Sequence, residues 1–216
     1  MALEIEQKIA KHFSNYPLRT YPKGQILIFA NGDPEHILYL IKGRVRQYDV
    51  SYRGDEVIVN IFMPPAFFPM SWPINKTVNK YFFKTETETK LRIIPPNDAL
   101  EFIKSNPDVM LDLLGRLYHG VDGLMGRMVH LMSGTANSRL IYELIVECRR
   151  LKPPKPQSSW TIVATEGDLA ARSGLSRETI SREMHKLKAE GLVEITSKNI
   201  VVKDLPKLEQ KLGTEL

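Results

Sequence analysis

Residues 164–202 constrain the fold of this chain most, because they contain two short helices separated by a tight turn. Thr165 can cap the first helix, since its hydroxyl accepts hydrogen bonds from the free N–H groups of the first turn. Gly174 stands between the helices, where the backbone needs a residue that adopts a positive φ. Ser176 can cap the second helix, with Thr179 in place of the Glu or Gln of a full capping box. This order predicts a helix-turn-helix.

The second predicted helix has one polar and one apolar face. Five polar side chains fall within an arc of about 140°: Arg177, Glu178, Ser181, Arg182 and His185. The apolar side chains on another arc are Ile180, Met184 and Leu187. A guanidinium matches O6 and N7 of guanine and a carboxylate accepts from N4 of cytosine, so the polar face suits the major groove of DNA. The hydroxyls of Thr165, Ser176 and Thr179 lie near helix N-termini, which suits phosphate groups.

A solvated helix with internal charge pairs is the alternative interpretation of residues 177–183. Two features that follow favour a DNA-binding unit instead. The Gly191-Leu192-Val193 turn and the apolar strand at residues 200–202 can form a two-stranded wing, which a surface helix would not need. We therefore predict a winged helix-turn-helix.

These residues also resemble a known family. The run from Ser176 to Arg182, followed by Leu187 and the Gly191 turn, looks like the DNA-binding domain of the Crp/Fnr transcription regulators. The resemblance covers nearly the whole chain. It implies a DNA-binding regulator that acts as a homodimer on a palindromic duplex.

Two overlapping sets of base-reading residues follow from this resemblance. In the Crp branch they are an Arg-Glu pair and a later Arg, which match Arg177, Glu178 and Arg182. In the Fnr branch they are Glu, Ser and Arg, which match Glu178, Ser181 and Arg182. The chain carries both sets.

The bulk composition is compatible with this interpretation. The 216 residues are 43% hydrophobic and 25% charged, as in ordinary soluble proteins, and the net charge is +5. A mild basic bias is compatible with a nucleic-acid partner. No signal peptide and no apolar run of about 20 residues is apparent, so we expect a cytoplasmic protein without a membrane segment.

The single cysteine, Cys148, excludes an intramolecular disulfide framework and a cysteine-rich metal site. It lies in a helical pattern with Leu144, Ile145 and Leu151. We interpret it as a small buried hydrophobe rather than a redox sensor. We also find no nucleophile–base pair, no metal-ligand spacing and no Gly-rich phosphate loop, so we predict neither an enzyme nor a metal site.

Residues 20–95 predict an antiparallel β-structure. Turn signals containing Gly24, Gly32, Gly43 and Gly54 recur at spacings of roughly ten residues. Between them lie the short strands QILIFA, HILYLI, VRQYDV and EVIVNIF, a pattern typical of a sandwich or barrel. A short amphipathic helix is expected over residues 3–13. The order of turns and strands resembles the cyclic-nucleotide-binding β-roll of the same family.

The resemblance is weakest at the ligand position. In cyclic-nucleotide-binding members a Gly-Glu pair takes the ribose, and an Arg about eleven residues later pairs with the phosphate. Here Pro69-Met70 and Lys80-Tyr81 occupy those positions. Proline has no amide donor, methionine has no carboxylate, and lysine is a point charge rather than a fork. We therefore do not expect the usual mode of cyclic-nucleotide binding.

Other effectors remain open at this point. One cysteine cannot hold an iron–sulfur cluster. A haem would need an axial ligand such as His12 or His36. The aromatic residues of this region can line an effector pocket or simply fill the interior, and we favour filling. The candidate pocket residues are Phe68, Met70, Ser71, Trp72, Lys80 and Tyr81. The sequence requires no cofactor, and the effector is unknown.

Residues 108–133 predict a long dimerisation helix. Apolar residues recur at spacings of four and three, as in a two-helix seam: Met110, Leu114, Leu117, Val121, Leu124, Met128 and Leu131. An amphipathic helix on its own domain is the alternative, although its apolar stripe is usually wider. Gly115, Gly120, Gly123 and Gly126 are unusual here, and indicate either close helix approach or a marginal seam.

The predicted fold class is therefore α+β. Its parts are a jelly-roll-like β-roll sensor at residues 1–107, a dimerisation helix and hinge at 108–134, and a winged helix-turn-helix at 135–216. Gly134 is the predicted hinge. The proline-rich segment 152–159 is expected to be an exposed loop. In the Crp branch the corresponding loop touches RNA polymerase, which makes an activating contact the minority hypothesis beside a simple connector.

Overall fold

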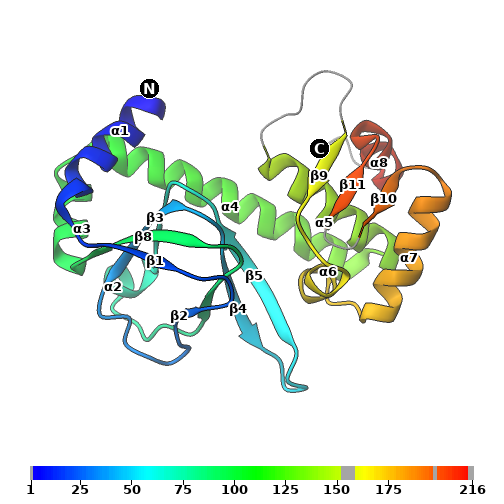
Figure 1. Cartoon of the computed structure of the whole chain (residues 1–216), viewed down its shortest axis with the longest axis horizontal. Helices are drawn as coiled ribbons and strands as arrows, with labels where there is room; N and C mark the ends of the chain where they lie inside the picture. Colours follow the sequence, from blue (N-terminus) through cyan, green and yellow to red (C-terminus); the bar gives the residue numbers. More distant parts are fainter. Residues whose placement is uncertain (1, 152–158, 197–198, 214–216) are drawn as a thin grey trace. The chain divides into compact units, whose positions relative to one another are not determined.

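The computed structural model describes residues 2–151, 159–196 and 199–213 (Figure 1). The chain divides into two compact units, Met1–Tyr118 and His119–Leu216. The first unit contains antiparallel sheets with flanking helices, and the second is mainly helical with a small sheet. The predicted α+β class is confirmed.

Two four-stranded antiparallel sheets form the body of the first unit. One has the order β1 (Leu18–Tyr21), β8 (Thr89–Ile94), β3 (Ile37–Lys42) and β6 (Ala66–Phe68). The other has the order β2 (Ile26–Ile28), β7 (Phe82–Thr85), β4 (Val45–Val50) and β5 (Glu56–Phe62). The four strands predicted from the turn spacing are β2 to β5. In both sheets, strands from early in the unit lie beside strands from late in the unit, as in a roll.

Strand β3 is buried on both faces of its sheet. Successive side chains of a strand point to opposite faces. Leu38 and Leu40 accordingly join the cluster that contains Phe68, whereas Ile37 and Tyr39 join a second cluster. The second cluster lies under the helices of this unit: α1 (Ala2–His12), the 3-10 turn η1 (Phe13–Asn15) and α3 (Pro96–Lys104). The first unit therefore has two cores, one on each side of this sheet.

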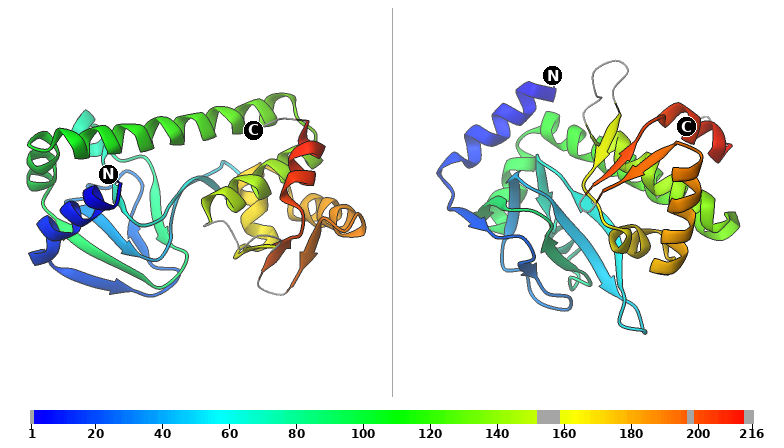
Figure 2. Two further views of the ribbon diagram at one scale, coloured as in Figure 1. Left: turned by 90° about the horizontal axis from the view of Figure 1, so that it is seen from above. Right: turned by 45° about the vertical axis from the view of Figure 1, so that its right-hand side comes forward.

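Helix α4 (Pro107–Ser133) is a single continuous helix of 27 residues (Figure 2). It begins at the Asn106-Pro107 pair, where proline suits the first helical turn. Val109 is its one buried residue among those that the structure describes. None of the helices in the described ranges is long and apolar enough to span a membrane.

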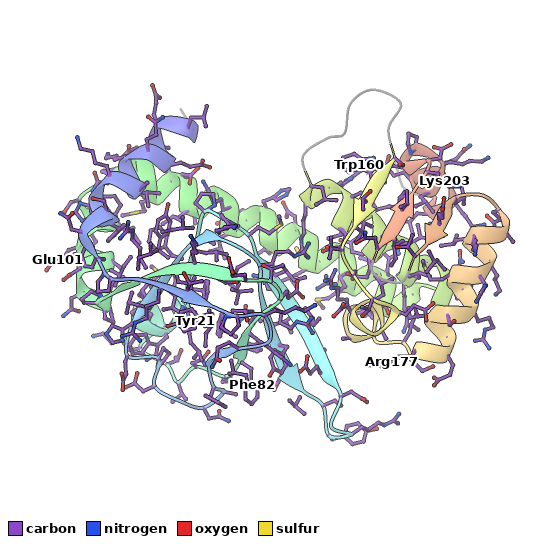
Figure 3. All side chains as sticks on the ribbon, viewed as in Figure 1. Tyr21, Phe82, Glu101, Trp160, Arg177 and Lys203 are labelled. Atoms are coloured by element: carbon purple, nitrogen blue, oxygen red, sulfur yellow. The ribbon has the colours of Figure 1, made fainter. Side chains whose placement is uncertain are left out.

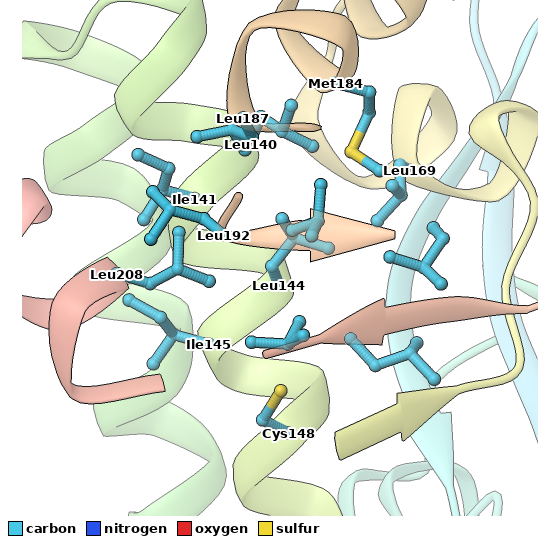
Figure 4. Close-up of a cluster of buried hydrophobic side chains, with 14 of the residues drawn as sticks. Leu140, Ile141, Leu144, Ile145, Cys148, Leu169, Met184, Leu187, Leu192 and Leu208 are labelled. Carbon is cyan, nitrogen blue, oxygen red and sulfur yellow. The ribbon is translucent and has the colours of Figure 1, made fainter. Parts of the chain in front are cut away.

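The second unit is built around α5 (Ala136–Arg150). The helix pair that follows is α6 (Glu166–Ser173) and α7 (Arg177–Ala189), and α8 (Leu205–Leu212) ends the described chain. Their aliphatic side chains meet in one core, to which α7 contributes Met184 and Leu187 (Figure 4). Leu208 places α8 in the same core.

The wing differs from its prediction. Strands β10 (Val193–Ile195) and β11 (Ile200–Val202) form the two expected strands, but β9 (Trp160–Ile162) adds a third beyond β11. β9 pairs antiparallel with β11, with Thr161 opposite Val201. The two predicted strands are confirmed, and β9 was missed because a three-residue strand carries too little periodicity to be recognised. The predicted loop at 152–159 falls, except for Ser159, outside the described residues.

Candidate nucleic-acid interface

Local hydrogen bonds set both ends of the helix-turn-helix. The hydroxyl of Thr165 accepts from the N–H of Asp168 at 3.1 Å, and the Asp168 carboxylate accepts from the N–H of Thr165 at 2.9 Å. Gly174 ends α6 with a φ of 66°, a conformation that suits glycine. The hydroxyl of Ser176 accepts from the N–H of Thr179 at 3.2 Å. These caps agree with the sequence prediction, which did not include the reciprocal bond of Asp168.

Helix α7 separates its side chains into a buried and an exposed face. Ile180, Met184 and Leu187 are fully buried in the aliphatic core. The predicted DNA-reading residues lie together on the remaining surface, where Ser181 is half-buried and four others are exposed: Arg177, Glu178, Arg182 and His185. The helix therefore presents hydrogen-bonding groups to solvent while its apolar side holds it in the unit.

Arg182 and Glu178 both lie on the exposed face of α7. The side chain of Arg182 is 67% exposed, and its contact with Glu183 is long, at 3.8 Å. Hydrogen bonds from its own backbone N–H and from the hydroxyl of Ser176 lower the pKa of Glu178. Glu178 is therefore an ionised acceptor at neutral pH, as a contact to the cytosine amino group requires.

Glu183 is a functional support that sequence reasoning missed. Although charged, it is only 5% exposed, and it accepts hydrogen bonds from Lys186 at 2.7 Å and from Asn137 of α5 at 3.2 Å. The bond from Lys186 lowers the pKa of Glu183, and the bond from Asn137 adds to this effect. Glu183 thus ties the reading helix to α5.

A buried ionic network joins three helices of this unit. Glu143 and Glu147 of α5 are each 1% exposed. Arg127 of α4 binds Glu143 with two hydrogen bonds, at 2.6 and 3.1 Å. Arg172 of α6 and Arg150 each lie 2.9 Å from Glu147. Buried charges need such pairing, so these contacts fix where α4, α5 and α6 lie with respect to one another.

Tyr142 of α5 accounts for one of the α4 glycines. Its hydroxyl donates to the carbonyl of Gly123 at 2.8 Å, and its ring fills the place that a Cβ on Gly126 would take. Cβ atoms on Gly115, Gly120 or Gly123 would meet open space within the described chain. Close helix approach therefore explains Gly126 alone.

The predicted dimer seam lies on the uncovered surface of α4. Six of its seven residues are exposed, from 39% for Val121 to 62% for Leu117, and Leu131 is half-buried. A second exposed apolar column runs beside the seam: Leu111, Tyr118, Met125 and Met132. This many exposed apolar side chains along one helix are unusual for a chain that acts as a monomer.

The predicted effector-pocket residues do not lie together: four belong to two different cores and two are exposed. Phe68 is fully buried between the sheets, where it stacks on Phe83 with ring centroids 5.2 Å apart, and Tyr81 packs against the same cluster. Met70 and Trp72 pack against the helix-side cluster instead. Ser71 and Lys80 are exposed. The structure therefore does not bring these six residues into one concavity.

The residues considered for metal or haem ligation are dispersed. His12 stacks on Phe102 at 4.2 Å, and His36 is exposed in a turn. Within the described ranges, no three His, Cys, Asp or Glu side chains gather in a group that could hold a metal ion. Burial raises the pKa of the Cys148 thiol to about 12, and the nearby Glu147 adds to this effect. The predicted buried position of Cys148 is confirmed.

Comparisons with known proteins agree with this architecture. The chain matches the model of a cyclic nucleotide-binding domain over residues 18–106 and that of a Crp-like helix-turn-helix domain over residues 138–211. It is 27% identical to the cyclic AMP receptor protein of Thermus thermophilus, over 91% of this chain and 88% of that protein. It is also 27% identical to the HTH-type transcriptional regulator ArcR of Staphylococcus aureus, over 93% of this chain and 91% of that protein.

A solved structure gives the same result for the fold. A CRP/FNR-family transcriptional regulator from Thermus thermophilus superimposes with a TM-score of 0.74 at 20% identity, covering 93% of this chain and all of that one. The two matched domains follow each other in the order that the residues of the roll and of the helix-turn-helix predict. The chain belongs to the Crp/Fnr family of DNA-binding transcription regulators.

Proposed function

We propose that the chain binds a two-fold symmetric duplex as a homodimer, with α7 of each copy in the major groove. The observation that carries the proposal is the division of α7 into a fully buried apolar face and an exposed face of hydrogen-bonding groups. Two such helices would read half-sites about 34 Å apart, one turn of the duplex. The predicted DNA contacts of the exposed face would be those of Arg177, Glu178, Ser181, Arg182 and His185, with Ser181 and His185 in secondary roles.

The uncovered seam of α4 supports the dimer. Its exposed residues recur at heptad spacing over most of the helix, from Met110 to Leu131. Packing two such seams together removes this apolar surface from water. Residues 1–107, 108–134 and 135–216 would then be the sensor, the dimer helix with its hinge at Gly134, and the DNA reader.

The packed interior of the roll is the argument for a regulator that binds DNA without a bound cyclic nucleotide. The stacked rings of Phe68 and Phe83 lie between the two sheets, and Pro69-Met70 replace the ribose-binding pair. The alternative is a regulator gated by a small effector. It is favoured by the matched cyclic nucleotide-binding domain and by the name of the Thermus relative, a cyclic AMP receptor protein.

Contacts with DNA phosphates and with RNA polymerase belong to the same proposal. The hydroxyls of Thr165, Ser176 and Thr179, which lie at the start of α6 and α7, would bind DNA phosphates. An activating contact with RNA polymerase through residues 152–159 concerns a segment that lies outside the described residues but for Ser159. A cytoplasmic location stays a prediction.

Selection from a randomised duplex pool tests the proposal. The ligand-free protein is incubated with the pool at a stated salt concentration, and the bound sequences are read. We expect a two-fold symmetric site. Enrichment that requires added cyclic AMP or cyclic di-GMP would establish the gated alternative. Weak, salt-sensitive binding without sequence preference under all these conditions would contradict both.

A further inference from the structure

The side chain of Arg177 lies against another helix rather than along α7. Arg177 is the first residue of α7 (Figure 3). Its guanidinium rests on Gly167 in the first turn of α6. A Cβ on Gly167 would lie 3.0 Å from Nη2 and 3.2 Å from Cζ of this guanidinium. The absence of a side chain at Gly167 therefore gives the guanidinium its place.

The guanidinium borders a surface concavity of about 530 Å³ between α6 and the wing. Its walls include Thr165 from the cap of α6, Thr196 beside the wing and the apolar side chain of Ile195. Of its charged lining residues, Glu166 is acidic and Arg177 is basic, so the positive charge there comes from Arg177. Among the described residues, no hydrogen bond or ion pair engages Arg177, and its donors are available to a ligand.

Arg182 has a different environment. It lies more than one turn further along α7, its side chain is 67% exposed, and Glu183 on its own helix is 3.8 Å away. Nothing in the described chain directs this guanidinium toward α6 or the wing. It can extend from the exposed face that it shares with Glu178 and Ser181.

We propose that Arg177 binds a phosphate of the DNA backbone at this concavity, and that base reading rests on Glu178, Ser181 and Arg182. This inference rests on the proposed function, since it assigns roles within the same interface. A guanidinium fork suits phosphate oxygens, and it supplies the donors here, because the hydroxyls of Thr165 and Thr196 already donate within the chain. A phosphate contact fixes the position of the reading helix without adding sequence preference.

The experiment compares Arg177→Ala, Arg177→Lys and Arg182→Ala in full-length protein, by duplex selection and by titration over a range of salt concentrations. For Arg177→Ala we expect the selected site of the native chain, weaker binding to every duplex, and a salt slope smaller by about 0.9 for each half-site. Arg177→Lys should restore the slope, because a lysine still serves a phosphate as a point charge. Arg182→Ala should relax one base position in each half-site.

Other results overturn the inference. A relaxed base position in Arg177→Ala, or an unchanged salt slope, would show that Arg177 does not act on the backbone. Both arginines are exposed, so a matching melting temperature for each variant and the native chain verifies that folding is retained. If the native chain selects no symmetric site, the proposed function fails at that step, before any variant is compared.

Discussion

The interiors of the two units are stabilised by different chemistry. Between the sheets of the first unit, aromatic rings such as Phe68 and Phe83 stack among aliphatic residues. An ion pair of that unit, Arg44 with Glu86 at 3.1 Å, leaves 12% and 9% of the two side chains exposed. The second unit instead buries Glu143 and Glu147 beside its aliphatic core.

The two kinds of interaction have different consequences: apolar packing fills an interior, whereas ion pairs fix the positions of helices. Apolar packing has no strong directional preference, so it can fill the roll without fixing the angle of any helix. Charge pairs are directional, and a misplaced partner is costly when buried. The second unit holds α5 and α6 together by an ion pair whose two side chains are each 1% exposed, whereas rings fill the space between the sheets of the roll.

The largest effect on stability is expected from removing a buried aromatic ring from the interior of the roll. Phe68→Ala should lower the free energy of unfolding of the first unit by about 3–5 kcal/mol, because it leaves a cavity between the sheets. Trp72 reports this unit by fluorescence in urea when Trp160 is replaced by Phe. Phe29→Ala, at a ring that is 60% exposed, is the control. A loss for Phe68→Ala no greater than for Phe29→Ala would contradict a packed interior.

Breaking the ionic network should have the next largest effect. Glu147→Ala leaves Arg172, whose side chain is 1% exposed, without this carboxylate, and should cost about 3 kcal/mol. Trp160 reports the second unit in a Trp72→Phe background. Arg149→Ala removes the more exposed pair with Glu209 and should cost less than about 1 kcal/mol. Equal costs would mean that burial does not distinguish the two pairs.

Removing a helix cap should have a smaller effect. Thr165→Ala deletes the hydroxyl that accepts from Asp168 and should destabilise the second unit by about 1 kcal/mol. Thr161→Ala, at an exposed threonine of β9, is the matched control. The measurement is the urea midpoint reported by Trp160. If both substitutions shift it equally, the cap is not what stabilises the start of α6.

The smallest effect concerns pH. The pKa of Glu183 is lowered in the folded protein. Its contribution to the free energy of unfolding is therefore fully present above the ordinary pKa of 4.5, and is lost as pH falls through the lower pKa of the folded state. Glu183→Gln should therefore flatten the fall in melting temperature of the second unit below about pH 4.5. Glu190→Gln, at an exposed glutamate paired with Lys211, should not. Parallel curves for Glu183→Gln and the native chain would contradict this assignment.

Features with local causes could be predicted from the sequence. The caps at Thr165 and Ser176 and the turn at Gly174 depend on residues within one helical turn of each other. Strands β2 to β5 could be predicted from the turns between them, which recur along the chain. The exposed face of α7 follows from helical periodicity alone.

Features that depend on distant residues could not be predicted in the same way. β9 exists because β11 pairs with it, and the position of Arg177 depends on Gly167 of another helix. Glu143 and Glu147 are four residues apart, which places them on one face of α5, but charged residues on a helix are usually exposed. Their burial depends on arginines from α4 and α6.

The contact of Tyr142 with Gly123 and Gly126 fixes the rotational phase of α4 against α5. Each residue turns a helix by about 100°. One inserted residue between Val121 and Gly123 would therefore turn the preceding part of the proposed seam by about 100° relative to the part that Tyr142 holds against α5. A change of about seven residues would nearly restore the phase. Insertions and deletions in this helix are therefore expected only in such steps, and ordinary length variation should fall in the turns of the roll.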